Sequence, residues 1–224
     1  QFAIASGRPW ASVEHAFEPV KRKIFYVANN GAYVGCCGRS LYVYSIEQEL
    51  VHRIIKKVRR YPDLEVVYAG ANGDYLESSN ERLMNWLIES YKFNLTRVDD
   101  LLGLDEPCVK VSIYKSQGIE AASRDIYEEF KDELKMSCAG DMWMDCMAKG
   151  VNKGRAIRTI QESLHIKPEE TMAFGDQLND MEMLEQAYYS FAVANARDEV
   201  RKAARFQTDS NENDGVLKIL KHLL

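Results

Sequence analysis

The chain has 224 residues, 46% of them hydrophobic and 28% charged, which is typical of a globular protein of one or two domains and not of a disordered chain. The net charge is −5, so we expect no basic face that binds nucleic acid. No apolar run reaches the ~18–20 residues that cross a bilayer, and we expect a cytoplasmic protein with no membrane partner.

The cysteines and histidines do not predict a metal site. None of the five cysteines belongs to a Cys-x-x-Cys pair, and the four histidines are scattered along the chain. A zinc site needs clustered ligands, so we expect the reduced thiols of a cytosolic protein instead.

The first thirty or so residues predict a strand, a helix and a second strand. The apolar run 2–5 is followed by Ser6-Gly7-Arg8-Pro9. Residues 10–22 carry apolar side chains at steps of three or four, which predicts an amphipathic helix that starts near the proline. The strand 24–28 is of the buried type and ends in the turn signal Asn29-Asn30-Gly31.

The middle of the chain has a different pattern, in which strand-like segments come in pairs. The predicted hairpins join 33–36 to 41–44, 65–70 to 74–78 and 134–139 to 142–147. Apolar and polar residues alternate over 109–114, which predicts a strand with one face turned to water. The helices predicted between these strands lie at about 46–60, 80–92 and 119–134. Asp145 is flanked by apolar residues, so we expect it to face a cleft or to pair with a core cation.

The last third of the chain returns to alternating strands and helices. The strands are predicted at 171–174, 190–193 and 206–208, and the helices at about 153–165, 179–188, 198–205 and after Gly215. This alternation favours a parallel sheet covered on both faces. We therefore expect an α/β core made of residues 1–33 and 147–224, into which an α+β domain of residues 34–146 is inserted.

One segment with candidate chemistry follows a predicted strand and precedes a helix, where ligands bind in open α/β sheets. Two carboxylates, Asp176 and Asp180, stand there with the amide of Asn179. These groups suit Mg²⁺, which takes oxygen ligands and usually keeps waters and a substrate phosphate. The alternative is that Asn179 caps the helix and Asp180 lies in its first turn.

Two further segments have the features of an anion site. The hydroxyl of Ser6 and the amide of Gly7 precede a helix, an arrangement that either binds phosphate or only caps the helix. Lys153 stands between Gly150 and Gly154 at a predicted helix start, where a cation is unfavourable. A bound phosphate would offset that cost, and the alternative is a solvated lysine in a turn.

Together these segments resemble the motifs of the haloacid dehalogenase superfamily of phosphohydrolases, and within it the Cof-like sugar-phosphatase group. The segment Ile4–Pro9 is similar to the second motif, Gly150–Gly154 to the third and Gly175–Met181 to the fourth. The segment Asn29–Ala32 is similar to the turn that leads into the inserted cap. The resemblance covers nearly the whole chain and implies a Rossmann-like parallel-sheet core with an α+β cap.

The resemblance also implies a role for each of these residues. Asp176 and Asp180 would hold Mg²⁺, and Lys153 would neutralise the charge of the phosphate. The other implied contacts are to the phosphate, from Ser6, Gly7 and Asn179, and to the substrate at the cap junction, from Asn30 and Gly31. The substrate implied is a small phosphorylated metabolite, in the first place a sugar phosphate.

The mechanism that the resemblance implies needs a residue that this sequence lacks. In the family, an aspartate of the first motif attacks phosphorus, and water then hydrolyses the aspartyl-phosphate. No Asp-x-Asp follows a core strand here, so we expect the nucleophile and the first core strand upstream of Gln1 and expect this chain alone to be inactive. Two alternatives stay open: a phosphosugar-binding or regulatory protein without a nucleophile, and a phosphomutase.

Overall fold

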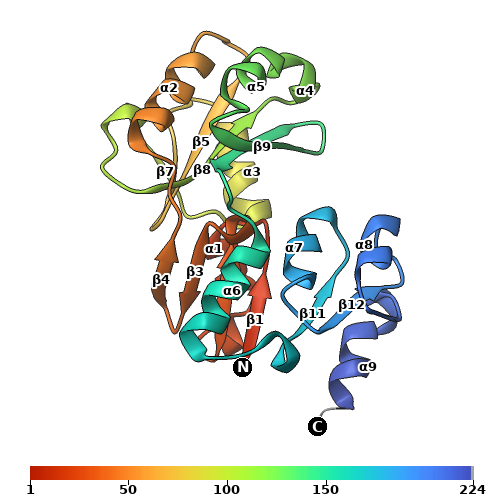
Figure 1. The fold of residues 1–224 in the computed structure, drawn as a ribbon. Coiled ribbons are helices and arrows are strands. Elements are labelled where there is room, and N and C mark those ends of the chain that lie inside the picture. The colour runs from red at the N-terminus through yellow and green to blue at the C-terminus, as the bar shows by residue number, and fades with distance from the viewer. Residues whose placement is uncertain (223–224) are drawn as a thin grey trace. The chain divides into compact units, whose positions relative to one another are not determined.

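The computed structural model describes residues 1–222 and divides the chain into two compact units, Gln1–Val151 and Asn152–Leu224 (Figure 1). Its strands form three separate sheets, two in the first unit and one in the second. Within residues 1–222, no helix has the length and the apolar character that a membrane crossing requires.

The first unit begins with a four-stranded sheet of order β1-β2-β3-β4. These strands are β1 (Phe2–Ala5), β2 (Ile24–Ala28), β3 (Tyr33–Cys36) and β4 (Arg39–Val43). The pair β1–β2 is parallel, whereas β2–β3 and β3–β4 are antiparallel. The β3–β4 hairpin, which we expected in the inserted domain, therefore extends the sheet of β1 and β2. The division into a core of 1–33 and 147–224 and an insert of 34–146 stays a prediction.

Helix α1 (Trp10–Ala16) is shorter than the helix predicted over 10–22. The prediction was wrong beyond Ala16 because Pro19 cannot donate an N–H bond and disfavours helical geometry in the residue before it. A 3-10 turn, Glu18–Val20, stands there instead. Val13 of α1 packs with Ile24 and Tyr26, so the helix covers one face of β2.

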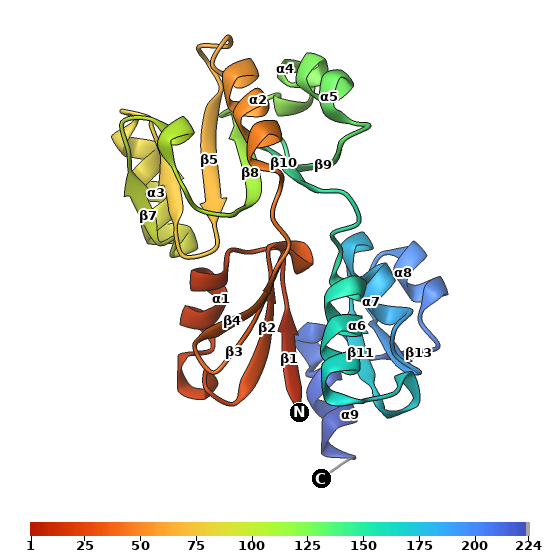
Figure 2. The same cartoon turned by 60° about the vertical axis from the view of Figure 1, so that its left-hand side comes forward.

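The rest of the first unit is built on a six-stranded sheet of order β7-β6-β5-β8-β10-β9 (Figure 2). Its strands are β5 (Glu65–Gly70), β6 (Asp74–Leu76), β7 (Leu95–Arg97), β8 (Cys108–Tyr114), β9 (Leu134–Ala139) and β10 (Trp143–Ala148). The two predicted hairpins of this region are confirmed, because β5–β6 and β9–β10 pair antiparallel. The short strand β7, parallel to β6, was not predicted.

Four helices accompany this sheet. They are α2 (Gln48–Val58), α3 (Glu81–Tyr91), α4 (Ile119–Ala122) and α5 (Arg124–Phe130). The single helix predicted over 119–134 is two short helices, because Ser123 leaves helical geometry with φ −101° and ψ 4°. The Ser123 hydroxyl donates to the carbonyl of Ile119 at 2.6 Å, a local bond that competes with the helix.

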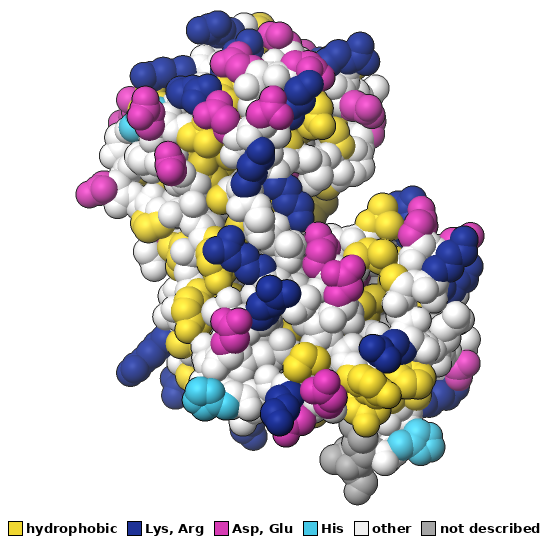
Figure 3. All heavy atoms as spheres, viewed as in Figure 1, with side chains coloured by type: hydrophobic (Ala, Val, Ile, Leu, Met, Phe, Trp, Pro, Cys, Tyr) yellow, Lys and Arg dark blue, Asp and Glu magenta, His cyan; other side chains and the backbone are white. Residues whose placement is uncertain are grey.

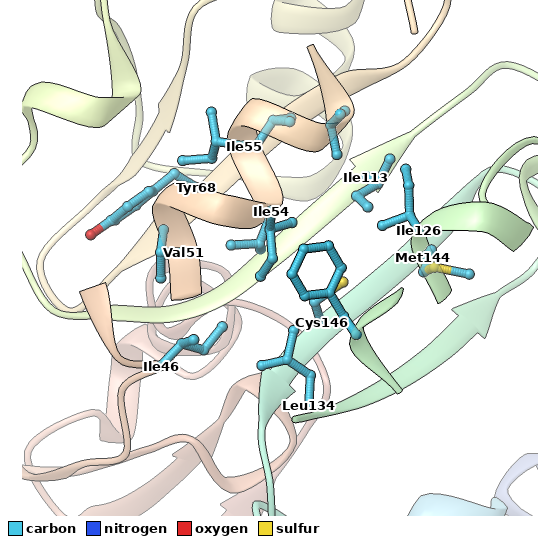
Figure 4. Close-up of a cluster of buried hydrophobic side chains, with 14 of the residues drawn as sticks. Ile46, Val51, Ile54, Ile55, Tyr68, Ile113, Ile126, Leu134, Met144 and Cys146 are labelled. Carbon is cyan, nitrogen blue, oxygen red and sulfur yellow. The ribbon is translucent and has the colours of Figure 1, made fainter. Parts of the chain in front are cut away.

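The main hydrophobic core lies between one face of this sheet and the helices α2, α4 and α5. Ile54 and Ile55 of α2 and Ile126 of α5 pack there against Ile113 of β8 (Figure 4). On the other face of the sheet, α3 covers Val67 of β5.

Strand β8 is buried on both faces, so the expectation that 109–114 turns one face to water was wrong. Lys110 and Ser112 are each only 6% exposed. The face that carries these polar side chains is covered by α3, which packs on Val67, and by Ala32, which packs on Ala69 and Met147.

The outer surfaces of α2 and α5 carry side chains of both signs, which Figure 3 shows interspersed over the upper elements. Lys57 of α2 binds Asp125 and Glu129 of α5 at 2.9 and 2.8 Å. The carboxylates of Asp125 and Glu129 are 68% and 42% exposed to water, which weakens these ion pairs, so the apolar core holds the helices to the sheet.

The second unit contains a three-stranded parallel sheet of order β11-β12-β13, which confirms the parallel sheet predicted for the end of the chain. The strands are β11 (Met172–Gly175), β12 (Tyr189–Val193) and β13 (Phe206–Thr208). The helices are α6 (Lys153–Leu164), α7 (Met181–Leu184), α8 (Asp198–Ala203) and α9 (Gly215–Lys221). The helix predicted over 179–188 is wrong in length, because a 3-10 turn, Leu178–Asp180, occupies its start.

Candidate active site

The loop after β1 is held by backbone hydrogen bonds to the end of β2. The Ser6 hydroxyl accepts from the N–H of Arg8 at 3.1 Å. The N–H groups of Asn29 and Asn30 donate to the carbonyls of Arg8 and Ser6 at 2.9 and 3.0 Å. The turn after β2 thereby fixes the loop that carries the predicted phosphate ligands Ser6 and Gly7.

Three consecutive residues of that turn have left-handed backbone geometry. The φ angles are 47° at Asn29, 55° at Asn30 and 99° at Gly31. Non-glycine residues in this region cost free energy and cluster at functional sites. A Cβ atom on Gly7 would lie 3.0 Å from the side-chain oxygen of Asn30, so the absence of a side chain at Gly7 lets the loop and the turn approach. The structure thus brings together Ser6, Gly7, Asn30 and Gly31.

Lys153 and Asp180 form a buried ion pair in the second unit. The Lys153 Nζ and Asp180 Oδ1 are 2.6 Å apart, and the two side chains are 7% and 6% exposed. Lys153 is the first residue of α6, directly after Asn152, whose side chain caps the helix by accepting from the N–H of Arg155 at 2.7 Å. The unfavourable place of a cation at this helix end is therefore offset inside the protein by Asp180, and not only by a bound phosphate as we expected.

Asp180 also holds the loop that follows β11. Its Oδ2 accepts from the N–H groups of Asp176 and Gln177, both at 3.0 Å. Gly175 makes this possible, because a Cβ atom there would lie 2.7 Å from the Cβ of Asp180. Both oxygens of Asp180 have protein partners, which fits a positioning residue, and its assignment as a metal ligand stays a prediction.

Asp176 lies at the carboxyl end of β11 with its carboxylate partly exposed. Its carbonyl accepts from the N–H of Arg197 at 3.0 Å, so the backbone is fixed on both sides of the residue. Its Oδ2 accepts from the side-chain amide of Gln177 at 2.9 Å. Asn179 is exposed in the neighbouring 3-10 turn. The second unit thus brings Lys153, Asp176 and Asp180 into one hydrogen-bonded group.

The carboxylate of Asp176 is the kind of ligand that a magnesium ion takes in proteins. Among residues 1–222, no three His, Cys, Asp or Glu side chains gather as a metal centre. Magnesium is usually held by one or two carboxylates, with waters and a substrate phosphate completing its six ligands. The single accessible carboxylate of Asp176 at a strand end meets that requirement.

The predicted site residues lie in both compact units, Ser6, Gly7, Asn30 and Gly31 in the first and Lys153, Asp176, Asn179 and Asp180 in the second. Their convergence on one phosphoryl group stays a prediction. Sequence reasoning missed Gln177, which binds both Asp176 and Asp180. Its place between two acidic residues, just after the end of a strand, was the available signal.

Comparison with known proteins gives one family over almost the whole chain. A family model described as haloacid dehalogenase-like hydrolase matches residues 1–220. The 5-amino-6-(5-phospho-D-ribitylamino)uracil phosphatase YbjI of Escherichia coli (strain K12) is 29% identical over 227 residues, which cover 99% of this chain and 84% of that protein. The phosphatase YwpJ of Bacillus subtilis (strain 168) is 25% identical over 100% of this chain and 88% of its own length.

Solved structures have the same fold. A crystal structure from Eubacterium rectale has a TM-score of 0.92 at 30% identity and covers 100% of this chain and 85% of that one. The structure of TM0651 from Thermotoga maritima has a TM-score of 0.89 at 25% identity, covering 98% of this chain and 84% of that one. The likeness therefore extends over both units.

Proposed function

We propose that this chain hydrolyses small phosphate monoesters such as sugar phosphates, with magnesium as its cofactor. The chain belongs to the haloacid dehalogenase-like hydrolase family and is a phosphohydrolase of that type. The observation that carries the proposal is the bonding of Asp180, which holds both Lys153 and the backbone of Asp176 at the end of β11. A fixed ammonium group and a partly exposed carboxylate, both tied to one residue, suit a phosphate ester and its divalent cation.

The chain's own residues bind and orient the phosphoryl group in this proposal. The Lys153 ammonium, fixed by Asp180, neutralises charge on the phosphoryl oxygens, which is the main form of stabilisation in phosphoryl transfer. Ser6 and the N–H of Gly7 donate to the same oxygens. Asp176 holds the magnesium ion, which supplies further neutralisation of charge when it is bound.

The proposed hydrolysis has two steps. A carboxylate oxygen of the first-motif aspartate that the resemblance implies bonds to phosphorus while the ester P–O bond breaks, and the leaving oxygen takes its proton from the second aspartate of that motif, which the water of the next step returns. Water then adds to the aspartyl-phosphate and releases inorganic phosphate, which restores the carboxylate.

The names of the relatives suggest the substrates to assay. Besides YbjI, the curated relatives YitU and YcsE of Bacillus subtilis (strain 168) are described as 5-amino-6-(5-phospho-D-ribitylamino)uracil phosphatases. A substrate panel therefore includes that compound along with pentose, hexose and alditol phosphates.

The test is phosphate release from this panel with and without Mg²⁺, using the protein with whatever residues its gene encodes before Gln1. We expect Asp176→Asn to lower kcat/KM at least 100-fold and to weaken the dependence on Mg²⁺, because the variant loses the charge that holds the ion. Glu185→Gln, which changes an exposed carboxylate of the same unit, is the matched control.

Wild-type rates in Asp176→Asn would contradict the metal assignment. Binding of inorganic phosphate without release from any ester would instead identify a phosphosugar-binding protein.

A further inference from the structure

Four polar residues lie on one face of the six-stranded sheet. The ladders set Asp74 opposite Ala69, Ala69 opposite Lys110, and Ser112 opposite Asp145. Residues opposite each other on neighbouring strands share a face. Ser112 lies two residues from Lys110 on β8, so the four side chains, from β6, β8 and β10, share one face, and Asp74 and Lys110 flank the small side chain of Ala69.

These four residues are buried, with exposures of 4–9%. Lys110 Nζ and Asp145 Oδ2 are 3.2 Å apart, and the Ser112 hydroxyl donates to Asp145 Oδ1 at 2.6 Å. A buried ion pair is weak evidence for a role in stability, because removing two charges from water costs about as much as their attraction returns. A gain in stability therefore does not explain why charged side chains are buried on this face of the sheet.

Asp74 differs from the other members of the cluster. Its carboxyl group accepts a hydrogen bond from the backbone N–H of Asn94. Burial raises the pKa of Asp74 to about 7, against the opposing influence of Lys110. Near neutral pH the carboxyl group is therefore present in both protonation states, and it can either accept or donate a hydrogen bond.

A pocket connects Asp74 with the turn after β2. It is lined by Pro9, Trp10 and Ala11 at the start of α1, by Asn29, by residues 70–74 and by Asn94. Its volume of about 10 Å³ is enough for one group the size of a water molecule. Asn29 is 2% exposed, and its side-chain oxygen has no hydrogen-bond partner within residues 1–222. An unsatisfied buried acceptor costs about 1–3 kcal/mol, and a bound donor would remove that cost.

The pocket adjoins the loop of the predicted phosphate ligands. Asn29 donates through its backbone to Arg8, and Asn30 donates in the same way to Ser6. Ala32, at the end of the same turn, packs on Ala69 and so touches the polar face of the sheet. The backbone therefore ties Asn29 directly to the loop in which Ser6 and Gly7 are proposed to hold the phosphate.

We propose that Asn29 and Asp74 form a specificity site that binds one hydroxyl group of a polyhydroxylated leaving group. The Asn29 side-chain oxygen accepts the hydroxyl proton, and the Asp74 carboxyl group binds the same hydroxyl from the sheet side. This inference rests on the proposed phosphatase activity and narrows its substrates to sugar and alditol phosphates.

The test compares kcat/KM for the best sugar or alditol phosphate of the panel with kcat/KM for phenyl phosphate, which has no hydroxyl group. We expect Asp74→Asn and Asn29→Gly each to lower the ratio of the two constants at least tenfold, through a higher KM for the polyol substrate. Glycine tolerates the φ of 47° at position 29. Asp63→Asn, which removes one exposed negative charge from the same unit, is the matched control and leaves the ratio unchanged.

An unchanged ratio in both variants, with native circular dichroism, would overturn the specificity site and leave the phosphatase activity standing. Equal losses on both substrates would overturn it as well, since they indicate a general structural role. If the wild-type protein released phosphate from neither substrate, the proposed function would fail together with this inference. A second readout does not need turnover: Asp74→Asn should weaken the binding of ribose 5-phosphate at least tenfold while leaving that of inorganic phosphate within twofold.

Discussion

At the residue scale, the carboxylate of Asp180 links the parts of the candidate site. It accepts three hydrogen bonds, one from Lys153 and two from the backbone N–H groups of Asp176 and Gln177. The change Asp180→Asn removes the negative charge and leaves the Lys153 ammonium buried without its counter-charge. Breaking a buried pair in this way costs about 3–5 kcal/mol. We expect urea unfolding to show a loss of that order, and phosphate release to fall at least 100-fold because the loop of Asp176 loses its anchor.

The control for this prediction is Asp209→Asn, which removes the partner of Lys218 at the surface of the same unit. The side chains of Lys218 and Asp209 are 55% and 57% exposed, so the loss should stay below about 1 kcal/mol. Equal losses in the two variants would show that the burial of the Lys153–Asp180 pair has no energetic consequence.

Motifs in the sequence named Lys153 and Asp176 as candidate site residues, and the structure ties both of them to Asp180. This bonding was not predicted, because the pairing of Lys153 with Asp180 joins residues 27 positions apart, and local pattern does not specify such contacts. The proximity of Asn29 and Asp74 was not predicted for the same reason. Each belongs to an ordinary turn or strand signal, and only the fold brings them to one pocket.

At the element scale, the contact of α6 with α7 depends on Gly154. A Cβ atom at this position would lie well inside 3.0 Å of the carbonyl of Glu182 in α7, a backbone atom that cannot rotate away. Gly154→Ala would ordinarily stabilise a helix by about 1 kcal/mol. Here we expect it to destabilise the protein by about 1–3 kcal/mol, since one helix must shift. Thermal unfolding of the variant measures the effect.

Gly103→Ala is the matched control, because no atom lies within 4 Å of a Cβ at Gly103. Its unfolding temperature should stay close to that of the wild type. A stabilised Gly154→Ala protein would contradict the close approach of the two helices.

The elements themselves were predicted best where periodicity and turn signals agreed. The β5–β6 and β9–β10 hairpins and the parallel strands at the chain end followed their patterns. The errors arose from single residues or from burial: Pro19 ends the first helix, Ser123 divides another, and β8 is covered on the side that alternation assigned to water.

At the scale of the whole molecule, the sequence established the fold class and the family, because the motifs recur in order along the chain and residues 1–220 match one family. The sheet that the β3–β4 hairpin joins did not follow from the sequence, and the domain bounds stay a prediction. Hairpin signals fix local pairing but not the sheet that a hairpin joins, and this one extends the sheet of β1 and β2.

The central claim is that Ser6 and Gly7 bind the same phosphoryl group as Lys153 and Asp176. The most direct measurement is a titration of the ¹⁵N-labelled protein with inorganic phosphate in the presence of Mg²⁺, observed at the backbone amides of Gly7 and Asp176. The account predicts that both amides shift along one binding curve with a single Kd. A shift of only one of them, or two curves with different Kd values, would contradict it.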